Sequence, residues 1–382
     1  MTRSFDFAVG RTNPETFPVD KMQRAAHAAI ERESEALTNY PGRLGHPGLR
    51  AIMAARESER EGVPVDPDAI ALMNGSMQAV TLTAEALTVP GDTVICEEFT
   101  YSGTIGAYRS LGIEMVGLPL DNDGMRVDLL ETTLDRLGAT RKPKFIYALT
   151  TYQNPSGTVM SNARRKQLIS IAENHDIPIV EDNCYGDVHF DGVKPPALYA
   201  LSDYAKIIYL CSLSKILAPG LRLGYLLARP PLFDQILDRR HDAGGNYLAA
   251  AIVAELYRDG VWPLTDHFNE SLCVKKNLVV DGLANELDDL CAWSNPAGGL
   301  FVWLRYPEDV DQKKLAELAE ARNVHFAPGA NFHINNEDRP YLRLAFGHVP
   351  DEDIRDGIPI LAQCIREART SNAPKEFDGL YE

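Results

Sequence analysis

Short apolar runs recur through the middle of the chain and are separated by stretches with helical spacing. Six of these runs are TVICEE (93–98), EMVGLPL (114–120), KFIYALT (144–150), PIVEDN (178–183), KIIYLCS (206–212) and LGYLLAR (223–229). They are short and rich in β-branched and aromatic residues, as the buried strands of a parallel sheet are. The alternation with helical stretches predicts an α/β fold with a mostly parallel sheet.

Two stretches between these runs are predicted helices. The apolar residues of the segment 162–176 share one face: Leu168, Ile169, Ile171 and Ala172. Ser161 stands directly before this segment, where an N-cap residue is expected. The segment 77–89 is largely apolar, which predicts a buried helix that ends at Pro90 and Gly91.

The two ends of the chain differ from this pattern. The segments 290–307 and 341–347 read as antiparallel strands, and 312–323 lies between them with helical spacing, which together predict a small α+β domain. The first 48 residues contain four prolines and little strand pattern, so we expect them to lie across another surface. The predicted division is an N-terminal segment (1–48), a large domain (49–285) and a small domain (286–382).

Composition narrows the class of protein. The 382 residues are 45% hydrophobic, enough for a sizeable core, and their formal net charge of −16 argues against a nucleic-acid partner. The six cysteines form no Cys-x-x-Cys pair, which is typical of a reducing compartment, and the histidines show no metal-ligand spacing. No leader segment or apolar run of about 18 residues is present. We therefore expect a cytoplasmic protein with no metal site and no membrane partner.

The stretch SLSKILAPGLR (212–222) raises a question about its lysine. Lys215 lies in otherwise uncharged and largely apolar surroundings, between two runs that are predicted strands. A buried, unpaired ammonium is costly, so one answer is an amine with a lowered pKa that forms a Schiff base. The other answer is a solvated lysine on a surface loop. This stretch alone does not decide between them.

Five further residues each allow a structural and a functional interpretation. Ser76 opens a helix, either as an ordinary cap or as part of a phosphate site at the helix N-terminus. Asp182 ends a predicted strand, where α/β sheets bind ligands, with Tyr185 three residues on. Asn154 lies in a turn-forming NPSG and can also donate to a ligand. Arg343 either reaches solvent or binds a carboxylate.

Taken together, the motifs follow an order and spacing that resemble a known family. They are FDFAVGRTNPETFP, YPGRLGHPGLR (40–50), NGSMQA, TYSG, YQNPSG, EDNCYG, SLSKILAPGLRLGY, PAGGLFVW and YLRLAFG. The chain resembles, nearly from end to end, the fold-type I pyridoxal-phosphate enzymes of the aspartate-aminotransferase superfamily. It is most similar to the branch with 2-aminoadipate and kynurenine-type aminotransferases and the aminotransferase-like domain of certain bacterial regulators. The resemblance implies an α/β large domain and a smaller α+β domain.

The resemblance also implies catalytic roles around pyridoxal 5'-phosphate. Lys215 would form the internal aldimine and shuttle the proton between steps. Asp182 would pair with the pyridine nitrogen. Tyr185 and Asn154 would hold the 3′-oxygen, and Tyr101 would stack on the ring.

Further roles concern the phosphate and the substrate. The residues implied around the phosphate are Ser76, the N–H groups of Met77 and Gln78, Ser212, Ser214, Arg222 and, from the second subunit of a homodimer, Tyr40. Arg343 would clamp the substrate α-carboxylate, with Asn154 and the backbone at Gly10 beside it. In such a homodimer the N-terminal segment would pack with the small domain and the dimer interface.

The implied reaction is a ping-pong transfer of an amino group from an L-α-amino acid to a 2-oxo acid. An oxidase, an elimination enzyme or a decarboxylase on the same fold is the alternative, and a sensor domain without turnover is a third. The chain starts at the family's opening segment, so we expect no preceding DNA-binding domain. The opening departs from the family at Arg11, which either pairs with an acidic substrate side chain or lies in solvent.

Overall fold

The computed structural model describes residues 3–371, 375, 377 and 379–381. A seven-stranded sheet forms its centre, in the order β2-β10-β9-β8-β7-β3-β4. These strands are β2 (Ile70–Met73), β10 (Gly224–Ala228), β9 (Ile207–Ser212), β8 (Ile179–Asp182), β7 (Ile146–Ala148), β3 (Thr93–Glu97) and β4 (Glu114–Leu118). Strand β10 pairs antiparallel with both of its neighbours, and the other neighbouring strands of the sheet pair in parallel. The predicted α/β fold with a mostly parallel sheet is confirmed.

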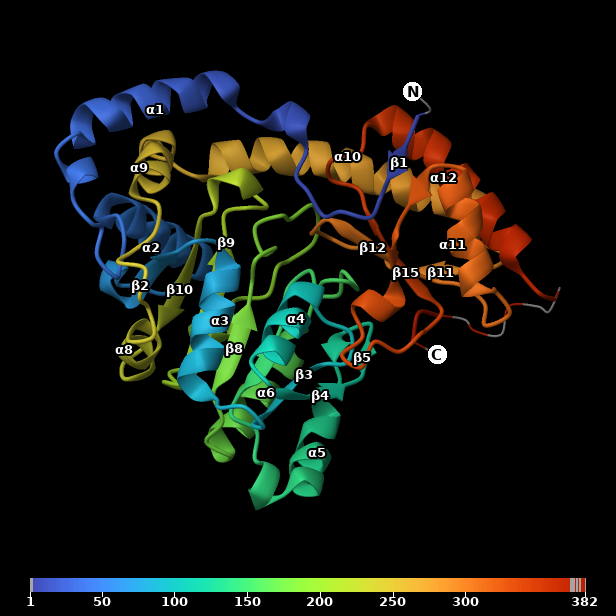
Figure 1. Cartoon of the computed structure of the whole chain (residues 1–382), viewed down its shortest axis with the longest axis horizontal. Helices are drawn as coiled ribbons and strands as arrows, with labels where there is room; N and C mark the ends of the chain where they lie inside the picture. The colour runs from blue at the N-terminus through green and yellow to red at the C-terminus, as the bar shows by residue number, and fades with distance from the viewer. Residues whose placement is uncertain (1–2, 372–374, 376, 378, 382) are drawn as a thin grey trace.

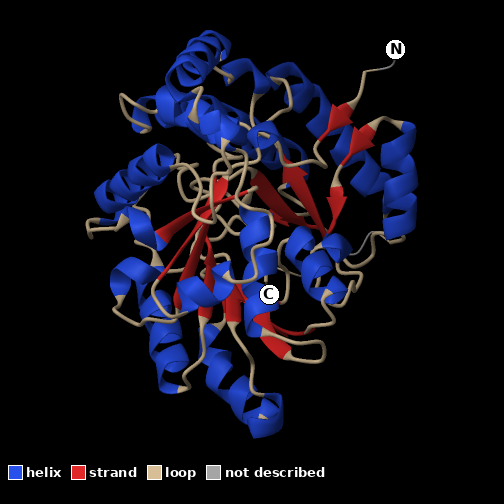
Figure 2. Cartoon of the chain, turned by 60° about the vertical axis from the view of Figure 1, so that its left-hand side comes forward, coloured by secondary structure: helices blue, strands red, loops and turns tan. Residues whose placement is uncertain are grey.

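Helices cover both faces of this sheet (Figure 2). The core on one face includes side chains from α2 (Pro47–Glu61) and α6 (Asn162–Asn174). The core on the other face includes α3 (Ser76–Leu87), α4 (Ser102–Ser110) and α8 (Leu232–Leu237). Successive strand residues alternate between the two cores, so each buried strand is apolar on both sides.

A second, four-stranded sheet is antiparallel throughout, in the order β11-β12-β15-β14. Its strands are β11 (Ala292–Trp293), β12 (Phe301–Arg305), β15 (Tyr341–Ala345) and β14 (Ala327–Pro328). Helix α11 (Gln312–Ala321) lies between β12 and β14 in the chain, and α12 (Asp351–Ala368) packs on both α11 and α10 (Trp262–Leu287). The antiparallel strands expected near the C-terminus are therefore present.

The remaining elements connect these two parts. Helix α1 (Val19–Glu33) lies along α9 (Tyr247–Leu256), and both lie at the opposite end of the molecule from α11 and α12 (Figure 1). The others are α5 (Leu130–Leu137), α7 (Leu198–Leu201), the hairpin β5 (Leu120–Asp121) and β6 (Gly124–Met125), β1 (Phe5–Asp6) and β13 (Val324–His325). Strand β1 pairs with β13 in parallel, so the N-terminal segment contributes a strand that its sequence does not indicate.

Several predicted bounds need correction. Strand β7 covers three residues, not the seven of 144–150, and β2 is not among the predicted strands. Ser161 occupies the N-cap position of α6, but its side chain forms no capping hydrogen bond. Helix α3 ends at Leu87, before Pro90, because the backbone adopts an extended conformation at Thr88. The predicted boundary at 285/286 falls inside α10, so the three-part division stays a prediction.

Candidate active site

A cavity of about 390 Å³ lies at the carboxyl ends of β8 and β9, beside the N-terminus of α3. Its volume is within the range of small-molecule sites. Twelve of the residues singled out from the sequence line it: Gly10, Ser76, Met77, Tyr101, Asn154, Asp182, Tyr185, Ser212, Ser214, Lys215, Arg222 and Arg343. They come from segments far apart in the chain, and the fold brings them together.

Lys215 follows β9 and is not on an open surface loop. Its Nζ donates to the Gly10 carbonyl at 3.0 Å and lies 5.7 Å from the centre of the Tyr185 ring. Burial lowers the pKa of Lys215 to about 8, and the positive charge of Arg343 acts in the same direction. A fraction of neutral amine is thus available near neutral pH, as nucleophilic attack on a carbonyl requires.

Asp182 is the last residue of β8 and only 4% exposed. Its carboxylate accepts a hydrogen bond from the Tyr147 hydroxyl at 2.6 Å and one from the Cys184 N–H at 3.2 Å. Burial raises the pKa of Asp182, while these hydrogen bonds and the Lys215 charge oppose that rise. Thr104 in turn contacts the Tyr147 hydroxyl at 3.0 Å, so the carboxylate is held in one orientation.

Tyr185 and Asn154 contact each other at the cavity wall. The Asn154 amide donates to the Tyr185 hydroxyl at 3.4 Å, and the Tyr185 ring packs edge-on against Phe301. Burial raises the pKa of Tyr185, so its hydroxyl keeps its proton and remains a donor. Tyr101 also lines this cavity, directly before α4.

One end of the cavity is suited to an anion. The first N–H groups of α3 lack intrahelical acceptors, and Ser76 lies at that helix end with Ser212 and Ser214 in the same cavity. Arg222 adds a positive charge there and has a left-handed φ of 52°. Gly75 has a φ of 78°, and a Cβ at that position would collide with the Arg222 guanidinium. The glycine therefore permits the close approach of arginine and helix end.

Arg343 lies at the other end, on β15. Its Nη1 donates to the Asn154 side chain at 2.9 Å and its Nη2 to the Ala8 carbonyl at 2.7 Å, while Nε is buried and has no hydrogen-bond partner. The guanidinium lies between the rings of Phe301 and Phe332, at 4.2 and 4.6 Å from their centres. It forms no ion pair within the described residues, and burial lowers its pKa to about 10.

Three of the sequence-predicted residues do not line this cavity. The Gln78 side chain donates to Asp242 at 2.7 Å, and its N–H donates to the Gly75 carbonyl at 3.2 Å. Tyr40 is 88% exposed. The Arg11 side chain is exposed.

Several residues in the cavity or in contact with it escape sequence reasoning. Tyr147 lies in an apolar strand and looks like an ordinary core residue, although its position on the strand beside β8 is a usable signal. Phe301 and Leu149 equally look like core residues. Cys184 lines the cavity next to Asp182, where the sequence suggests only a small buried thiol.

This set of groups fits pyridoxal phosphate. The phosphate requires donors and positive charge, which the α3 end, Ser212, Ser214 and Arg222 offer. The ring nitrogen requires a fixed carboxylate, and the aldehyde requires an amine of lowered pKa; Asp182 and Lys215 meet these needs. The unsatisfied Arg343 Nε fits a substrate carboxylate. No cluster of metal-binding side chains is found within the described residues.

The known proteins that this chain is similar to include aminotransferases, which agrees with a site suited to pyridoxal phosphate. The family model for aminotransferase class I and II matches residues 10–360. Aromatic-amino-acid aminotransferase 1 of Thermococcus litoralis is 34% identical, over 94% of this chain and 87% of its own. The crystal structure of the multiple substrate aminotransferase of Thermococcus profundus has a TM-score of 0.91 and 32% identity, covering 96% of this chain and 92% of its own.

A second solved structure carries the cofactor moiety. It is the alpha-aminoadipate aminotransferase LysN of Thermus thermophilus, complexed with N-(5'-phosphopyridoxyl)-L-leucine, with a TM-score of 0.88 and 28% identity over 96% of this chain and 92% of its own. Among the described residues, no helix combines the length and apolar character needed to cross a bilayer. The family match spans most of the chain, and so the protein belongs to aminotransferase class I and II and is a pyridoxal-phosphate-dependent aminotransferase.

Proposed function

We propose that this cavity transfers the amino group of α-amino acids with apolar or aromatic side chains, using Lys215 as the lysine that binds the cofactor. The observation that carries the proposal is the state of Arg343. Its guanidinium is buried, forms no ion pair with a described carboxylate and leaves Nε unsatisfied. Such a group is costly unless an anion binds it, and an α-carboxylate matches its planar fork.

The residues divide the chemistry among them. Bound pyridoxal phosphate supplies an aldehyde carbon for the amine and a ring that delocalises the electrons left when the α-proton departs. Lys215, with its lowered pKa, would accept that proton from Cα and deliver it to the former aldehyde carbon of the cofactor. Asp182, held in place by Tyr147, would stabilise positive charge at the ring nitrogen. Tyr185 and Asn154 would orient the ring through its 3′-oxygen.

The lining of the cavity supports the choice of substrate side chain. Around Arg343 it is formed by Ala8, Val9, Tyr101 and Phe301. Among the described lining residues the cations are Lys215, Arg222 and Arg343. Their proposed partners are the cofactor, its phosphate and the substrate α-carboxylate, in that order. No positive charge remains there for an acidic side chain, since Arg11 lies outside the cavity. Among the relatives, the name of the aromatic-amino-acid aminotransferase points the same way, whereas LysN is named for alpha-aminoadipate and was solved with a leucine adduct.

A homodimer in the cytoplasm completes the proposal. Tyr40 is 88% exposed here, which is unusual for a tyrosine and suits a residue that reaches the phosphate of a second subunit. The thiols are all free, as a reducing compartment favours. Light scattering of the active enzyme at assay concentration should give the mass of a dimer, and an active monomer would contradict the shared site.

A half-reaction without acceptor tests the proposed function. We would mix holoenzyme with phenylalanine, leucine, 2-aminoadipate or aspartate and follow the visible spectrum and the 2-oxo acid released. One 2-oxo acid per site, formed fastest from phenylalanine and leucine, is expected. The matched amines without a carboxylate, phenylethylamine and isopentylamine, should react far more slowly. Fastest reaction with aspartate or 2-aminoadipate would reject the side-chain proposal.

A further inference from the structure

A second group of charged side chains is buried where α2 packs on the central sheet. Helix α2 turns Arg56, Glu57, Arg60 and Glu61 inward, with side-chain exposures of 1, 0, 5 and 1%. These four residues lie on the same buried face of α2 as Leu49 and Met53. The buried face of a helix is usually apolar, so four charged residues there are unusual. With Asp187, we call these four residues the α2 cluster.

The cluster is paired throughout by ion pairs and tyrosine hydroxyls. Arg60 donates to Glu61 at 2.6 Å and to Tyr209 at 2.5 Å, and it also pairs with Glu57. Glu57 accepts a further hydrogen bond from the Tyr199 hydroxyl at 2.7 Å. Because burying a charge is costly unless it is paired, each member of the cluster is held by its own partners.

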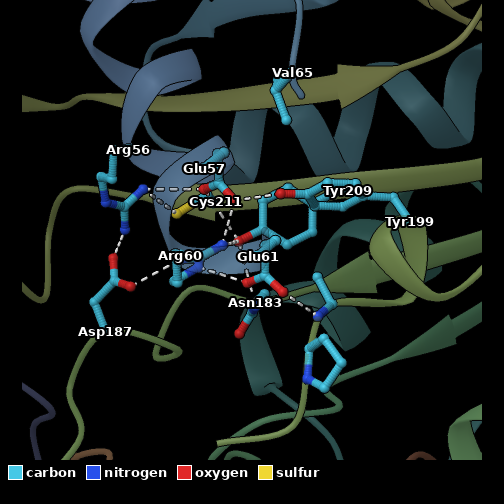
Figure 3. Close-up of polar contacts among 12 residues, drawn as sticks. Arg56, Glu57, Arg60, Glu61, Val65, Asn183, Asp187, Tyr199, Tyr209 and Cys211 are labelled. Carbon is cyan, nitrogen blue, oxygen red and sulfur yellow. Dashed lines mark hydrogen bonds and ion pairs between the residues drawn. The ribbon is translucent and has the colours of Figure 1, made fainter. Parts of the chain in front are cut away.

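Asp187 connects this cluster to the cavity. Figure 3 shows its carboxylate between two guanidinium groups of α2: Arg60 donates at 2.7 Å, and Arg56 forms an ion pair with the other oxygen. Asn183 also donates to the Tyr209 hydroxyl at 3.3 Å, so the loop is held at two points.

The same loop carries a cavity residue on its other side. Asn183–Val188 forms two successive turns, in which the Gly186 N–H donates to the Asn183 carbonyl at 3.3 Å and the Val188 N–H to the Tyr185 carbonyl at 2.8 Å. Tyr185 lines the cavity, two residues before Asp187. A shift of Asp187 therefore moves the turn that presents the Tyr185 hydroxyl.

From this geometry we infer that Arg56 and Arg60 are positioning residues for the cofactor, acting through Asp187 on Tyr185. The inference rests on the proposed contact between Tyr185 and the 3′-oxygen. The role is to fix the hydroxyl of Tyr185 rather than to touch substrate. Small misplacements of a group next to reacting atoms lower rates steeply, which gives the cluster a kinetic as well as a structural effect.

The test compares Asp187→Asn, Tyr185→Phe and the double variant as cofactor-loaded enzymes. The readout is the pH at which the visible spectrum of the bound cofactor changes, together with kcat and KM for the best amino acid. Tyr185→Phe should shift that pH, and Asp187→Asn should shift it in the same direction with a kcat roughly tenfold lower and an unchanged KM. In the double variant Asp187→Asn should add almost no further shift, since both act through one hydroxyl.

Glu61→Gln is the matched control. It removes one buried charge from the same cluster, but Glu61 contacts Arg60 and the Ala197 N–H, not the loop Asn183–Val188. It should lower the melting temperature without moving the spectral titration. If Asp187→Asn does not fold, Arg60→Lys should give the same shift. This substitution keeps the positive charge but removes the planar guanidinium group.

The outcomes separate the inference from the proposed function. A shift in Tyr185→Phe with none in Asp187→Asn or Arg60→Lys overturns the inference and leaves the role of Tyr185 intact. Additive shifts in the double variant also overturn it. If Tyr185→Phe causes no shift, the proposed contact of Tyr185 is wrong, and the inference that rests on it is wrong as well.

Discussion

Two regions beside the central sheet bury charge in opposite ways. Where α2 packs on the sheet, every carboxylate of the α2 cluster meets a guanidinium, and Glu57 alone contacts Arg56, Arg60 and three tyrosine hydroxyls. In the cavity at the carboxyl ends of β8 and β9, Lys215, Asp182 and Arg343 form no ion pair within the described residues. Their pKa values shift with burial, because no partner of opposite charge is close enough to cancel it.

This difference shows how a binding site can be distinguished from a structural one. Both regions have several buried ionisable groups, so their number alone does not identify the active site. In the α2 cluster every carboxylate has a guanidinium partner, although the buried Arg56 Nε has no hydrogen-bond partner. In the cavity Lys215, Asp182 and Arg343 would find their partners in the proposed cofactor and substrate. Substitutions in the cavity should therefore act mainly on activity, and substitutions in the α2 cluster mainly on stability.

The largest effect is expected at Lys215. Lys215→Ala should lower kcat by at least about 1,000-fold, since the nucleophile and the proton carrier are both lost. Lys275 is a still more deeply buried lysine, at 1% exposure, but it donates to the Val349 carbonyl at 2.6 Å and to Asp351 at 3.0 Å. Lys275→Met should lower the melting temperature and keep kcat. Steady-state kinetics with thermal melts measure both; a fully active Lys215→Ala would remove Lys215 from the site.

Asp182 and Glu57 offer the next comparison, between two buried carboxylates. Asp182→Asn should reduce kcat about 100- to 1,000-fold at nearly unchanged stability, because its charge acts mainly in the transition state. Glu57→Gln should instead cost about 3–5 kcal/mol of unfolding free energy, because it leaves two buried guanidinium groups short of a partner. Urea unfolding and kcat are the measurements. Near-normal turnover in Asp182→Asn would contradict the electrostatic role.

Arg343 and Arg165 differ in the same way. Arg165 is fully buried, donates to the Thr150 carbonyl at 2.6 Å and lies 3.4 Å from Glu181, so Arg165→Lys should mainly destabilise the fold. Arg343→Lys should lower kcat/KM for amino acids about 10- to 100-fold, through the loss of a bidentate contact of about 1.5–3 kcal/mol. Equal kinetics for amino acids and for the matched amines in the native enzyme would refute the carboxylate contact.

The smallest effect concerns pH. Lys215 has a pKa lowered to about 8 from the ordinary 10.5, chiefly by burial. Because the neutral amine is the reactive form, the rate at which cofactor-free enzyme binds added pyridoxal phosphate should rise with pH and level off above about 8. Arg343→Gln should move this midpoint upward, since a neighbouring positive charge disfavours the ammonium. A rate that still rises above about pH 10 would indicate an ordinary, solvated lysine.

Much of the fold can be predicted from the sequence because buried parallel strands are continuous apolar runs. Each of the six predicted runs differs from its observed strand by at most two residues at either end. Strand β7 is shorter than predicted, because Leu149 and Thr150 already belong to the loop that leads to Asn154. Strand β1 has only two residues and is defined by its pairing with β13, which no local pattern reveals.

The site could be predicted in part, and for a different reason. Lys215, Asp182 and Arg343 are polar residues within or beside apolar strands, so their positions are conspicuous. Tyr147 is not, since a tyrosine in a buried strand looks like a core residue. The α2 cluster is hidden in ARESERE (55–61), where a run of alternating charges normally indicates a solvated helix face. Only tertiary packing shows that these charges point inward.

The central claim is that Lys215 is the lysine that binds the cofactor. Reducing the holoenzyme with borohydride fixes the cofactor to its lysine as a stable amine, and peptide mass spectrometry then locates it. We predict one modified lysine per chain, Lys215. Lys194 is the informative competitor, because burial lowers its pKa to about 7 although it lies beside Asp187 of the α2 cluster. Modification of Lys194, or of any lysine other than Lys215, would contradict the account.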